Sequence, residues 1–176
     1  MNANEIDGWM SERELKWLAE VASRFHVVLE FGSWKGRSTK ALASAMHPLG
    51  KVYAVDHFEG TIDGVLKCGD VYQQFCANLA DEIKTRKVVP VACKTADFRV
   101  CCPSQFLKAE MVFIDADHSY EAVKADIRMA LSVLADPGVI CGHDYTDDYP
   151  GVKQAVHELV PTAQKIDGGD IWWATV

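Results

Sequence analysis

The chain has 176 residues, 49% of them hydrophobic and 24% charged, which is ordinary for a globular domain with a sizeable core. The formal net charge of −7 disfavours broad contact with a phosphate backbone, so we expect no nucleic-acid substrate. No apolar run reaches membrane-spanning length, and residues 1–5 carry no basic segment, so we expect a cytoplasmic protein with no membrane partner.

The first 25 residues are predicted to form a helical lead-in to a single domain that spans residues 1–176. Ser11 and Glu14 have the spacing of a capping box, and apolar residues follow at helical intervals to about Arg24. No Pro/Gly-rich linker or internal repeat divides the rest of the chain. We therefore expect this helix to cover the sheet or part of a ligand-binding mouth.

Residues 27–38 are predicted to form a buried strand, a glycine turn and the start of a helix. The strand leads to Glu30, and Gly32 and Gly36 bracket the turn. A helix start of this kind brings backbone N–H groups and a positive helix end up to a ligand. Trp34 would block the close approach of a pyrophosphate and the Glu30 carboxylate would repel one, whereas the carboxylate would attract a cation.

The pattern Glu30-x-Gly32-x-x-x-Gly36 resembles motif I of the class I S-adenosylmethionine-dependent methyltransferases. S-adenosylmethionine carries an ammonium and a sulfonium group and no phosphate. The resemblance implies that Glu30 holds the ammonium end of this cofactor and that the turn holds its methionine part. The turn residues so implied are Gly32, Ser33, Trp34, Gly36 and Ser38. A Rossmann-like turn with a different ligand, or with none, is the alternative.

Residues 51–56 read as a second strand that ends in Asp56, 24 residues after Gly32. In a βαβ unit, an acid at this tip can accept hydrogen bonds from ribose hydroxyls, although a helix cap or a solvated acid would look the same. The polar loop from His57 to Asp70 is expected to line or cover the site, and His57 is a further cofactor-binding candidate. A helix is predicted over residues 71–84.

A third strand is predicted over residues 87–93, where Pro90 favours an edge position. Related methyltransferases often have Gly-Asp-Ser after this strand, facing the adenine. The matching residues here are Cys93-Lys94-Thr95, which departs from that pattern and leaves Thr95 as the adenine-side candidate. Asp97 is expected to cap a short helix over residues 98–107.

An apolar strand over residues 110–114 delivers Asp115 and Asp117 at its tip, and Ser119 is expected to cap a helix that runs to residue 134. Residues 113–120 read Phe-Ile-Asp-Ala-Asp-His-Ser-Tyr. This run closely resembles motif IV of a group of small-molecule O-methyltransferases that includes sugar and macrolide methyltransferases. The resemblance implies a small-molecule acceptor and places Asp115 in the site.

The remaining predicted elements are a turn at 136–138, a strand over 139–145 ending in His143 and Asp144, a helix from Pro150 to Val160, and a hairpin over 163–176. Strands that alternate with helices and end in a hairpin predict an α/β fold, with a doubly wound Rossmann-like sheet that is mostly parallel and has a C-terminal antiparallel strand. Trp172 and Trp173 must face opposite sides. One is expected in the core, and the other is exposed, covered by a helix, or part of a homodimer contact.

Methyl transfer needs a nucleophile held in line behind the sulfonium methyl group and a base that removes the acceptor's proton. His118 and His143 are both candidates for that base, each with a purely structural alternative, and Asp115 is a candidate for catalysis and for cofactor binding. Resemblance to metal-dependent relatives implies that Asp115, His143 and Asp144 bind Mg²⁺ or another divalent metal. Because hard Mg²⁺ prefers oxygen ligands, a softer metal, no metal, or a ligand set without His143 remain alternatives.

The sequence therefore predicts transfer of a methyl group from S-adenosylmethionine to a small molecule, with a hydroxyl oxygen as the favoured acceptor. Two rival functions remain. One is a nucleotide- or NAD-binding Rossmann protein, against which Trp34 and Glu30 argue. The other is a methyltransferase-like protein that binds cofactor or a partner without turnover.

Overall fold

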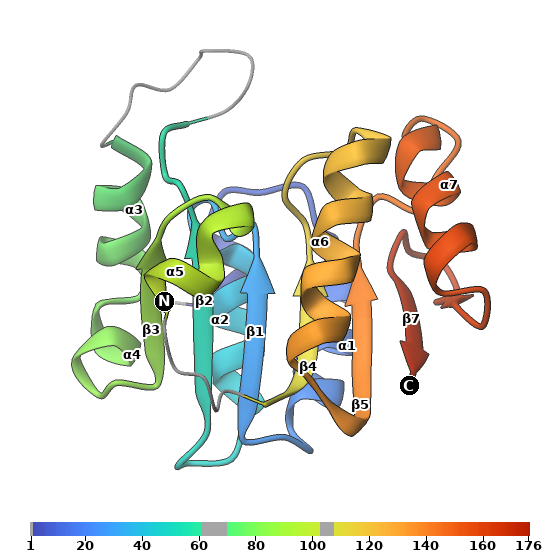
Figure 1. Ribbon diagram of the computed structural model, residues 1–176. Coiled ribbons are helices and arrows are strands. Elements are labelled where there is room, and N and C mark those ends of the chain that lie inside the picture. The colour runs from blue at the N-terminus through green and yellow to red at the C-terminus, as the bar shows by residue number, and fades with distance from the viewer. Residues whose placement is uncertain (1, 61–69, 103–107) are drawn as a thin grey trace.

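A computed structural model describes residues 2–60, 70–102 and 108–176 of the chain. Its centre is a seven-stranded sheet in the order β3-β2-β1-β4-β5-β7-β6 (Figure 1). Strands β1 to β5 pair in parallel, and β7 runs antiparallel to both of its neighbours. The strands are β1 (Val27–Phe31), β2 (Lys51–Asp56), β3 (Val88–Ala92), β4 (Ala109–Ile114), β5 (Leu134–Gly142), β6 (Gln164–Lys165) and β7 (Trp172–Thr175). The predicted fold class is confirmed.

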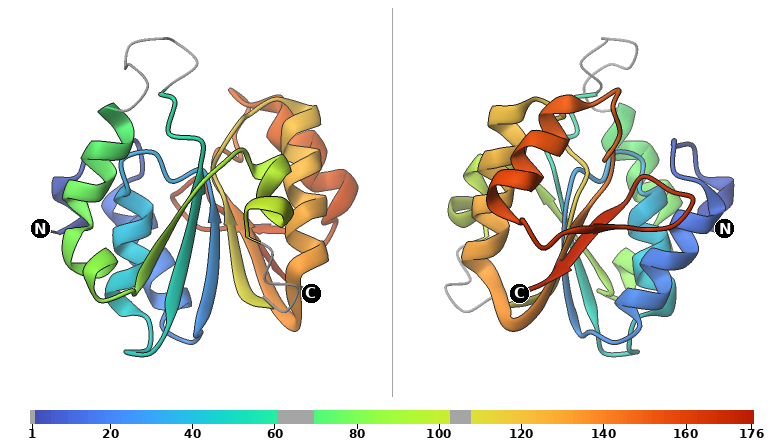
Figure 2. Two further views of the ribbon diagram at one scale, coloured as in Figure 1. Left: turned by 60° about the vertical axis from the view of Figure 1, so that its left-hand side comes forward. Right: turned by 90° about the vertical axis from the view of Figure 1, so that its right-hand side faces the viewer.

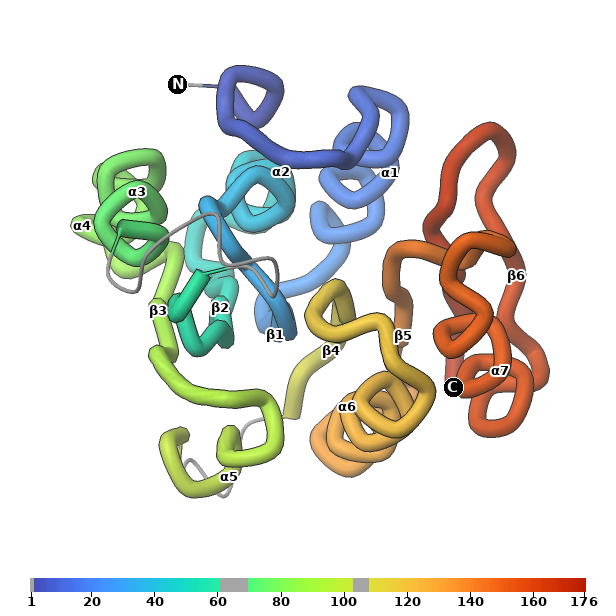
Figure 3. Tube along the Cα trace, turned by 90° about the horizontal axis from the view of Figure 1, so that it is seen from above, coloured from blue at the N-terminus to red at the C-terminus, as the bar shows by residue number. Residues whose placement is uncertain are grey.

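Helices cover both faces of this sheet, as Figures 2 and 3 show. On one face lie the 3-10 helix η1 (Ala3–Glu5), α1 (Glu12–Ala22), α2 (Arg37–Ala45), α3 (Asp70–Asn78) and α4 (Ala80–Lys84). On the other lie η2 (Thr95–Asp97), α5 (Phe98–Cys101), α6 (Tyr120–Val133) and α7 (Pro150–Leu159). Because both faces are covered, the central strands are apolar almost throughout, as β4 illustrates with Met111, Val112 and Phe113 at 0% exposure.

The topological switch point of the sheet lies between β1 and β4. These strands are neighbours, yet the chain leaves them in opposite directions, to β2 on one side and β5 on the other. Open α/β sheets bind ligands at the carboxyl ends of such strands. Backbone hydrogen bonds align the tips there: the Asp115 N–H donates to the Phe31 carbonyl at 2.7 Å, and the His143 N–H to the Ile114 carbonyl at 3.0 Å.

Several local predictions were wrong in detail. The helix predicted over residues 71–84 is interrupted at Leu79, whose φ of −115° leaves the helical range. Leu79 is fully buried, and its side chain fills the space next to Gly36. The predicted turn at 136–138 instead lies within β5, because Gly138 exchanges two backbone hydrogen bonds with Val176.

The two side-chain helix caps that the sequence predicted do not form. Asp97 and Ser119 stand at the predicted N-cap positions, but neither side chain makes a capping hydrogen bond. The Ser119 N–H instead donates to the Asp117 carboxylate at 2.6 Å. The helix predicted over 98–107 ends at Cys101, and residues 103–107, like residues 61–69 of the long loop, lie outside the described residues.

The adjacent tryptophans at the C-terminus follow one of the predicted alternatives. Trp172 is 1% exposed in the core, and the Trp173 ring packs on Trp17 of α1 with 6.2 Å between ring centroids. The second tryptophan is thus covered by a helix of the same chain, and the homodimer stays a prediction. Pro90 lies on β3, the outermost strand, as predicted. None of the helices in the described residues is long and apolar enough to cross a bilayer.

Candidate active site

The glycine turn between β1 and α2 needs its glycines for close approach. Gly32 has a φ of +86°, and a Cβ there would lie 2.0 Å from the carbonyl oxygen of Asp115. Gly36 has a φ of +89°, and a Cβ there would lie 2.6 Å from a methyl carbon of Leu79. Only glycine adopts such dihedrals without strain. The turn can therefore press against the tip of β4, with Gly32 directly against the backbone of Asp115.

The Asp56 carboxylate shapes this turn through backbone contacts that the sequence did not indicate. Its Oδ2 accepts the N–H groups of Ser33 and Trp34 at 2.9 and 2.8 Å, and its Oδ1 accepts the N–H of Phe58 at 2.7 Å. A carboxylate has about four lone-pair sites, so Oδ1 keeps one acceptor site. Asp56 thus holds the turn from the tip of β2, and its contact with a ribose hydroxyl stays a prediction.

The Glu30 side chain is fully buried beneath the turn and accepts three hydroxyl groups. The donors are Ser33 at 2.8 Å, Ser38 at 2.6 Å and Thr39 at 2.5 Å. Burial raises the pKa of Glu30 to about 7, the three hydroxyls oppose that shift, and the charge of Asp115 adds to it. The described contacts of the Glu30 carboxylate are therefore with these three hydroxyls, and its contact with a cofactor ammonium group stays a prediction.

Glu30 fixes the orientation of hydroxyl groups at the start of α2. Each hydroxyl has one proton, and Ser38 donates its proton to Glu30. The Ser38 oxygen can therefore only accept a hydrogen bond from any further partner. Such an oxygen suits an N–H donor and not a carbonyl or phosphate oxygen. A cationic ligand, which was predicted from the charge of Glu30, can therefore donate a hydrogen bond to the Ser38 oxygen.

The cofactor candidates outside the turn are committed to contacts within the chain. The exposed His57 accepts the N–H of Glu59 on its Nδ1 at 2.9 Å. The Thr95 hydroxyl donates to Asp126 of α6 at 2.6 Å. Asp126 is 4% exposed, and burial raises its pKa to about 6. The cofactor roles of His57 and Thr95 stay predictions, and Asp126 was missed because it is a single acid on an otherwise apolar helix face.

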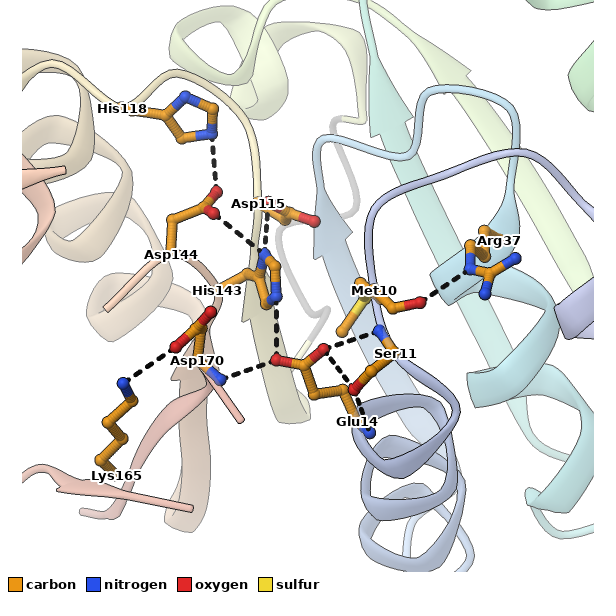
Figure 4. Close-up of polar contacts among 10 residues, drawn as sticks. All are labelled: Met10, Ser11, Glu14, Arg37, Asp115, His118, His143, Asp144, Lys165 and Asp170. Atoms are coloured by element: carbon orange, nitrogen blue, oxygen red, sulfur yellow. Dashed lines mark hydrogen bonds and ion pairs between the residues drawn. The ribbon is translucent and has the colours of Figure 1, made fainter. Parts of the chain in front are cut away.

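A cluster of carboxylates and imidazoles lies where the tips of β4 and β5 meet α1 (Figure 4). His143 is at its centre. The His143 Nε2 lies 3.1 Å from Oε1 of Glu14, and its Nδ1 lies 3.3 Å from Asp144 and 3.8 Å from Asp115. His118 completes the cluster, with Nε2 at 2.8 Å from the second oxygen of Asp144. The structure therefore brings together the predicted residues Asp115, His118, His143 and Asp144, and adds Glu14.

His143 is held as an imidazolium. Burial, which leaves it 8% exposed, lowers its pKa, but the hydrogen bonds to Asp144 and Glu14 and the charge of Asp115 outweigh burial and raise that pKa to about 11. Burial likewise opposes ionisation of Glu14, yet contacts from His143, the Asp170 N–H and Ser11 lower the pKa of Glu14 to about 2. His143 and Glu14 are therefore both charged at neutral pH.

The other two acids of the cluster, Asp144 and Asp115, have pKa values shifted in opposite directions. Burial disfavours the Asp144 carboxylate, but the hydrogen bonds from His118 and His143 hold its pKa well below the usual range. Burial raises the pKa of Asp115 to about 6, with His143 opposing and the charge of Asp144 adding to the shift. Asp144 has a φ of +58°, an uncommon conformation outside glycine that places its side chain between the two imidazoles.

His118 has the surroundings of a general base. Its side chain is 38% exposed, and its ring packs on Tyr149 with 4.5 Å between centroids. The hydrogen bond to Asp144 is the main cause of its raised pKa. Among the described residues nothing hydrogen-bonds its Nδ1, so that nitrogen can receive a proton from the hydroxyl group of a methyl acceptor. His143, by contrast, has both ring nitrogens engaged by carboxylates, which favours His118 over His143 as the base.

The predicted metal ligands Asp115, His143 and Asp144 do not form a ligand set. A nitrogen that donates a hydrogen bond has no lone pair for a metal, and both nitrogens of His143 face carboxylates. Within the described residues, the group whose ligand atoms lie within 4.8 Å of one another contains His118 in place of His143. There, the positive His143 ring lies 3.8 Å from Asp115 and 3.3 Å from Asp144, so a dication held by these carboxylates would face a like charge. This arrangement does not fit a divalent cation.

Comparisons with known proteins agree with this geometry. A methyltransferase-domain family model matches residues 29–145, from β1 to just beyond the tip of β5. The structure is similar to cofactor-bound Rv0187 from MTB (TM-score 0.75, 22% identity, 99% of this chain and 84% of that one). It is also similar to an O-methyltransferase from Bacillus cereus in complex with SAH (TM-score 0.71, 17% identity, 99% and 86%).

A third similar structure is the O-methyltransferase TomG from Streptomyces achromogenes, which is involved in tomaymycin synthesis and was solved with SAM (TM-score 0.69, 17% identity, 94% of this chain and 79% of that one). No curated protein matches the sequence. At these identities the structural similarities establish the fold, whereas the family match covers the glycine turn and the tips of β4 and β5. The chain belongs to the S-adenosylmethionine-dependent methyltransferases.

Proposed function

We propose that this enzyme transfers the methyl group of S-adenosylmethionine to a hydroxyl oxygen of a small-molecule acceptor, with His118 as the general base. The observation that carries the proposal is the half-exposed His118, oriented by Asp144 at 2.8 Å, beside the tip of β4 where the glycine turn presses closest. A hydroxyl group is a poor nucleophile until its proton is removed, and a histidine oriented by a carboxylate removes protons near neutral pH.

The cofactor would lie across the glycine turn. Ser38 would accept a hydrogen bond from its ammonium group, because Glu30 already takes the Ser38 proton. Asp115 would balance the positive charge of the cofactor from the tip of β4, and the free acceptor site on Asp56 would take a ribose hydroxyl. The methionine end of the cofactor would then point at the cluster that contains His118.

In the reaction, the acceptor hydroxyl gives its proton to Nδ1 of His118 as its oxygen attacks the methyl carbon. S-adenosylmethionine would supply this methyl group and leave as S-adenosylhomocysteine, with the electron pair of the broken carbon–sulfur bond on sulfur. Asp144 accepts the Nε2–H of His118 and stabilises the imidazolium that forms. His143 holds the other oxygen of Asp144 and so keeps it in place.

Three observations support a small hydroxylic acceptor. The structural relatives include O-methyltransferases from Bacillus cereus and Streptomyces achromogenes, the latter acting in the synthesis of a small molecule. The acidic chain, with its net charge of −7, disfavours a nucleic-acid acceptor. A small pocket at the strand tips is lined by Asp115, His118, His143, Asp144, Val152 and Trp172, so carboxylate and imidazole groups adjoin an apolar wall.

The test combines His118→Gln with a panel of phenolic and sugar hydroxyl acceptors. We expect wild-type protein to form methylated product, and kcat of the variant to fall roughly 100-fold to 10,000-fold, the usual contribution of a general base. Binding of S-adenosylhomocysteine, measured by calorimetry, should stay within about threefold, because the contacts that the described residues give His118 are with Asp144 and Tyr149 and not with the glycine turn. His47→Gln, at an exposed histidine beyond the end of α2, is the matched control.

Each rival function predicts a different result. A nicotinamide-binding protein would be stabilised by NAD and not by S-adenosylhomocysteine in a thermal-shift assay. A protein that binds without turnover would bind S-adenosylhomocysteine and methylate no acceptor in the panel. A His118→Gln variant with wild-type kcat would exclude His118 as the base.

A further inference from the structure

His143 is a buried cation surrounded by carboxylates from three parts of the chain. Glu14 approaches its Nε2 from α1, and Asp144 and Asp115 approach its Nδ1 from the tips of β5 and β4 (Figure 4). The exposed fractions of the His143 and Glu14 side chains are 8% and 5%, so water cannot screen this charge well. The cluster therefore contains its own positive charge at the point where its acids converge.

Carboxylates on both sides of the ring favour protonation of both ring nitrogens. A carboxylate oxygen can only accept a hydrogen bond, so a nitrogen beside an ionised carboxylate must donate. Nε2 lies 3.1 Å from Glu14, and Nδ1 lies 3.3 Å from Asp144. A ring that donates on both sides is an imidazolium and has no lone pair for a metal. A dication between Asp115 and Asp144 would also face the positive ring directly.

We infer that His143 takes the place of a divalent metal in this enzyme: its imidazolium, held by Glu14, fills the cation position between Asp115 and Asp144, and methyl transfer proceeds without a bound metal. The inference rests on the proposed function in one respect, because it takes the strand-tip cluster as the site of transfer. It also makes Glu14 a positioning residue that acts through His143.

Four hydrogen-bond contacts fix the Glu14 carboxylate, so that it can position the His143 ring. Its Oε1 accepts the backbone N–H of Asp170 at 2.7 Å as well as the His143 contact, and its Oε2 accepts both the N–H and the hydroxyl of Ser11 at 2.7 Å. The start of α1 and the segment before β7 therefore hold the carboxylate from two sides. Such a fixed partner keeps the His143 ring in one orientation between the two aspartates.

The test is a titration with Mn²⁺, followed by electron paramagnetic resonance, on wild-type protein and on His143→Asp. Wild-type protein should bind no stoichiometric Mn²⁺ at 1:1 ratios up to roughly millimolar concentration. His143→Asp replaces the imidazolium with a third carboxylate and should gain one Mn²⁺ site, at least about tenfold tighter than any wild-type binding. Adding Asp115→Asn to that variant should abolish the gain, which places the new site at the strand tips.

Two further readings on wild-type protein separate this inference from the proposed function. Calorimetry with S-adenosylhomocysteine should give the same affinity, within about twofold, with and without EDTA, and methylation rates should be equally unaffected. Absence of S-adenosylhomocysteine binding would defeat the proposed function, whereas the Mn²⁺ titration of the apo protein would still decide the inference. Nitrogen-15 NMR of His143 at pH 8 should show both ring nitrogens protonated, a reading that needs no variant to fold.

Three results would overturn the inference. The first is a stoichiometric Mn²⁺ site in wild-type protein that disappears in Asp115→Asn. The second is a neutral His143 ring in the NMR spectrum at pH 8. The third is a folded His143→Asp variant, with a wild-type circular dichroism spectrum, that gains no Mn²⁺ site.

Discussion

Replacing Glu30 with glutamine should change how the stability of the apo protein depends on pH. Glu30 is fully buried, and burial raises its pKa from 4.5 to about 7. The folded state therefore holds a proton on Glu30 that the unfolded chain releases above pH 4.5. Stability falls as pH rises through this window and the contribution of the proton is fully lost above the folded pKa of about 7.

The size of the effect follows from the pKa difference. Folding raises the pKa of Glu30 by about 2.5, and a pKa difference of one corresponds to about 1.4 kcal/mol. Wild-type protein should therefore lose about 3 kcal/mol of stability between pH 4.5 and pH 8. Glu30→Gln has the shape of the protonated side chain and cannot ionise, so it escapes this loss. The difference in unfolding free energy between variant and wild type should therefore grow by about 3 kcal/mol in favour of the variant.

Urea unfolding followed by tryptophan fluorescence measures this difference at pH 4.5, 6 and 8. Comparing the two proteins at each pH removes the contribution of His143, whose pKa is also shifted, whereas the measured difference includes the effect of Asp115 on Glu30. Glu121→Gln, at an exposed position in the first turn of α6, is the control and should show a difference that does not vary with pH. A pH-independent difference for Glu30→Gln itself would refute the argument that burial favours the neutral side chain.

Three further predictions concern the turn and the cluster. Gly32→Ala should lower the unfolding free energy by at least about 2 kcal/mol, measured by urea unfolding, since its Cβ would lie 2.0 Å from the backbone of residue 115; unchanged stability would contradict the tight approach. Ser38→Ala should weaken S-adenosylhomocysteine binding roughly tenfold by calorimetry, with the exposed Ser132→Ala as control; equal affinities would exclude Ser38 as the ammonium acceptor. Glu14→Gln should lower the pKa of His143 by roughly 1 to 3 in an NMR titration, and an unmoved pKa would remove Glu14 from the cluster.

Much of the fold could be predicted because its causes are local. The bounds of β1 and β2 follow from short apolar runs that end in an acid, and the glycine turn follows from the need for positive φ at Gly32 and Gly36. The run of residues 113–120 identified the tip of β4 and the histidine at its end. The order of helices and strands then indicated a mostly parallel sheet with a C-terminal antiparallel strand, which the structure confirms.

The contacts that decide the chemistry could not be predicted in the same way. Glu14 shows as a capping-box residue, and nothing local indicates that its other oxygen reaches a histidine 129 residues away in the chain. Glu30 was expected to face a ligand, but the hydroxyl of Thr39, which comes into reach only once α2 has formed, helps to enclose it. The position of His143 looked like that of a metal ligand because the sequence does not show which groups face its two nitrogens.

The contact of Glu14 with the strand-tip cluster has a practical consequence for how this enzyme is compared with others. The family match begins at residue 29, so the matched segment does not include Glu14, whose carboxylate contacts His143. A comparison or chimera drawn from the matched segment alone would keep both strand tips and discard the group that sets the charge between them. Homologues of this type are better compared by the residue pair at positions 14 and 143, on α1 and at the tip of β5, than by their shared motifs.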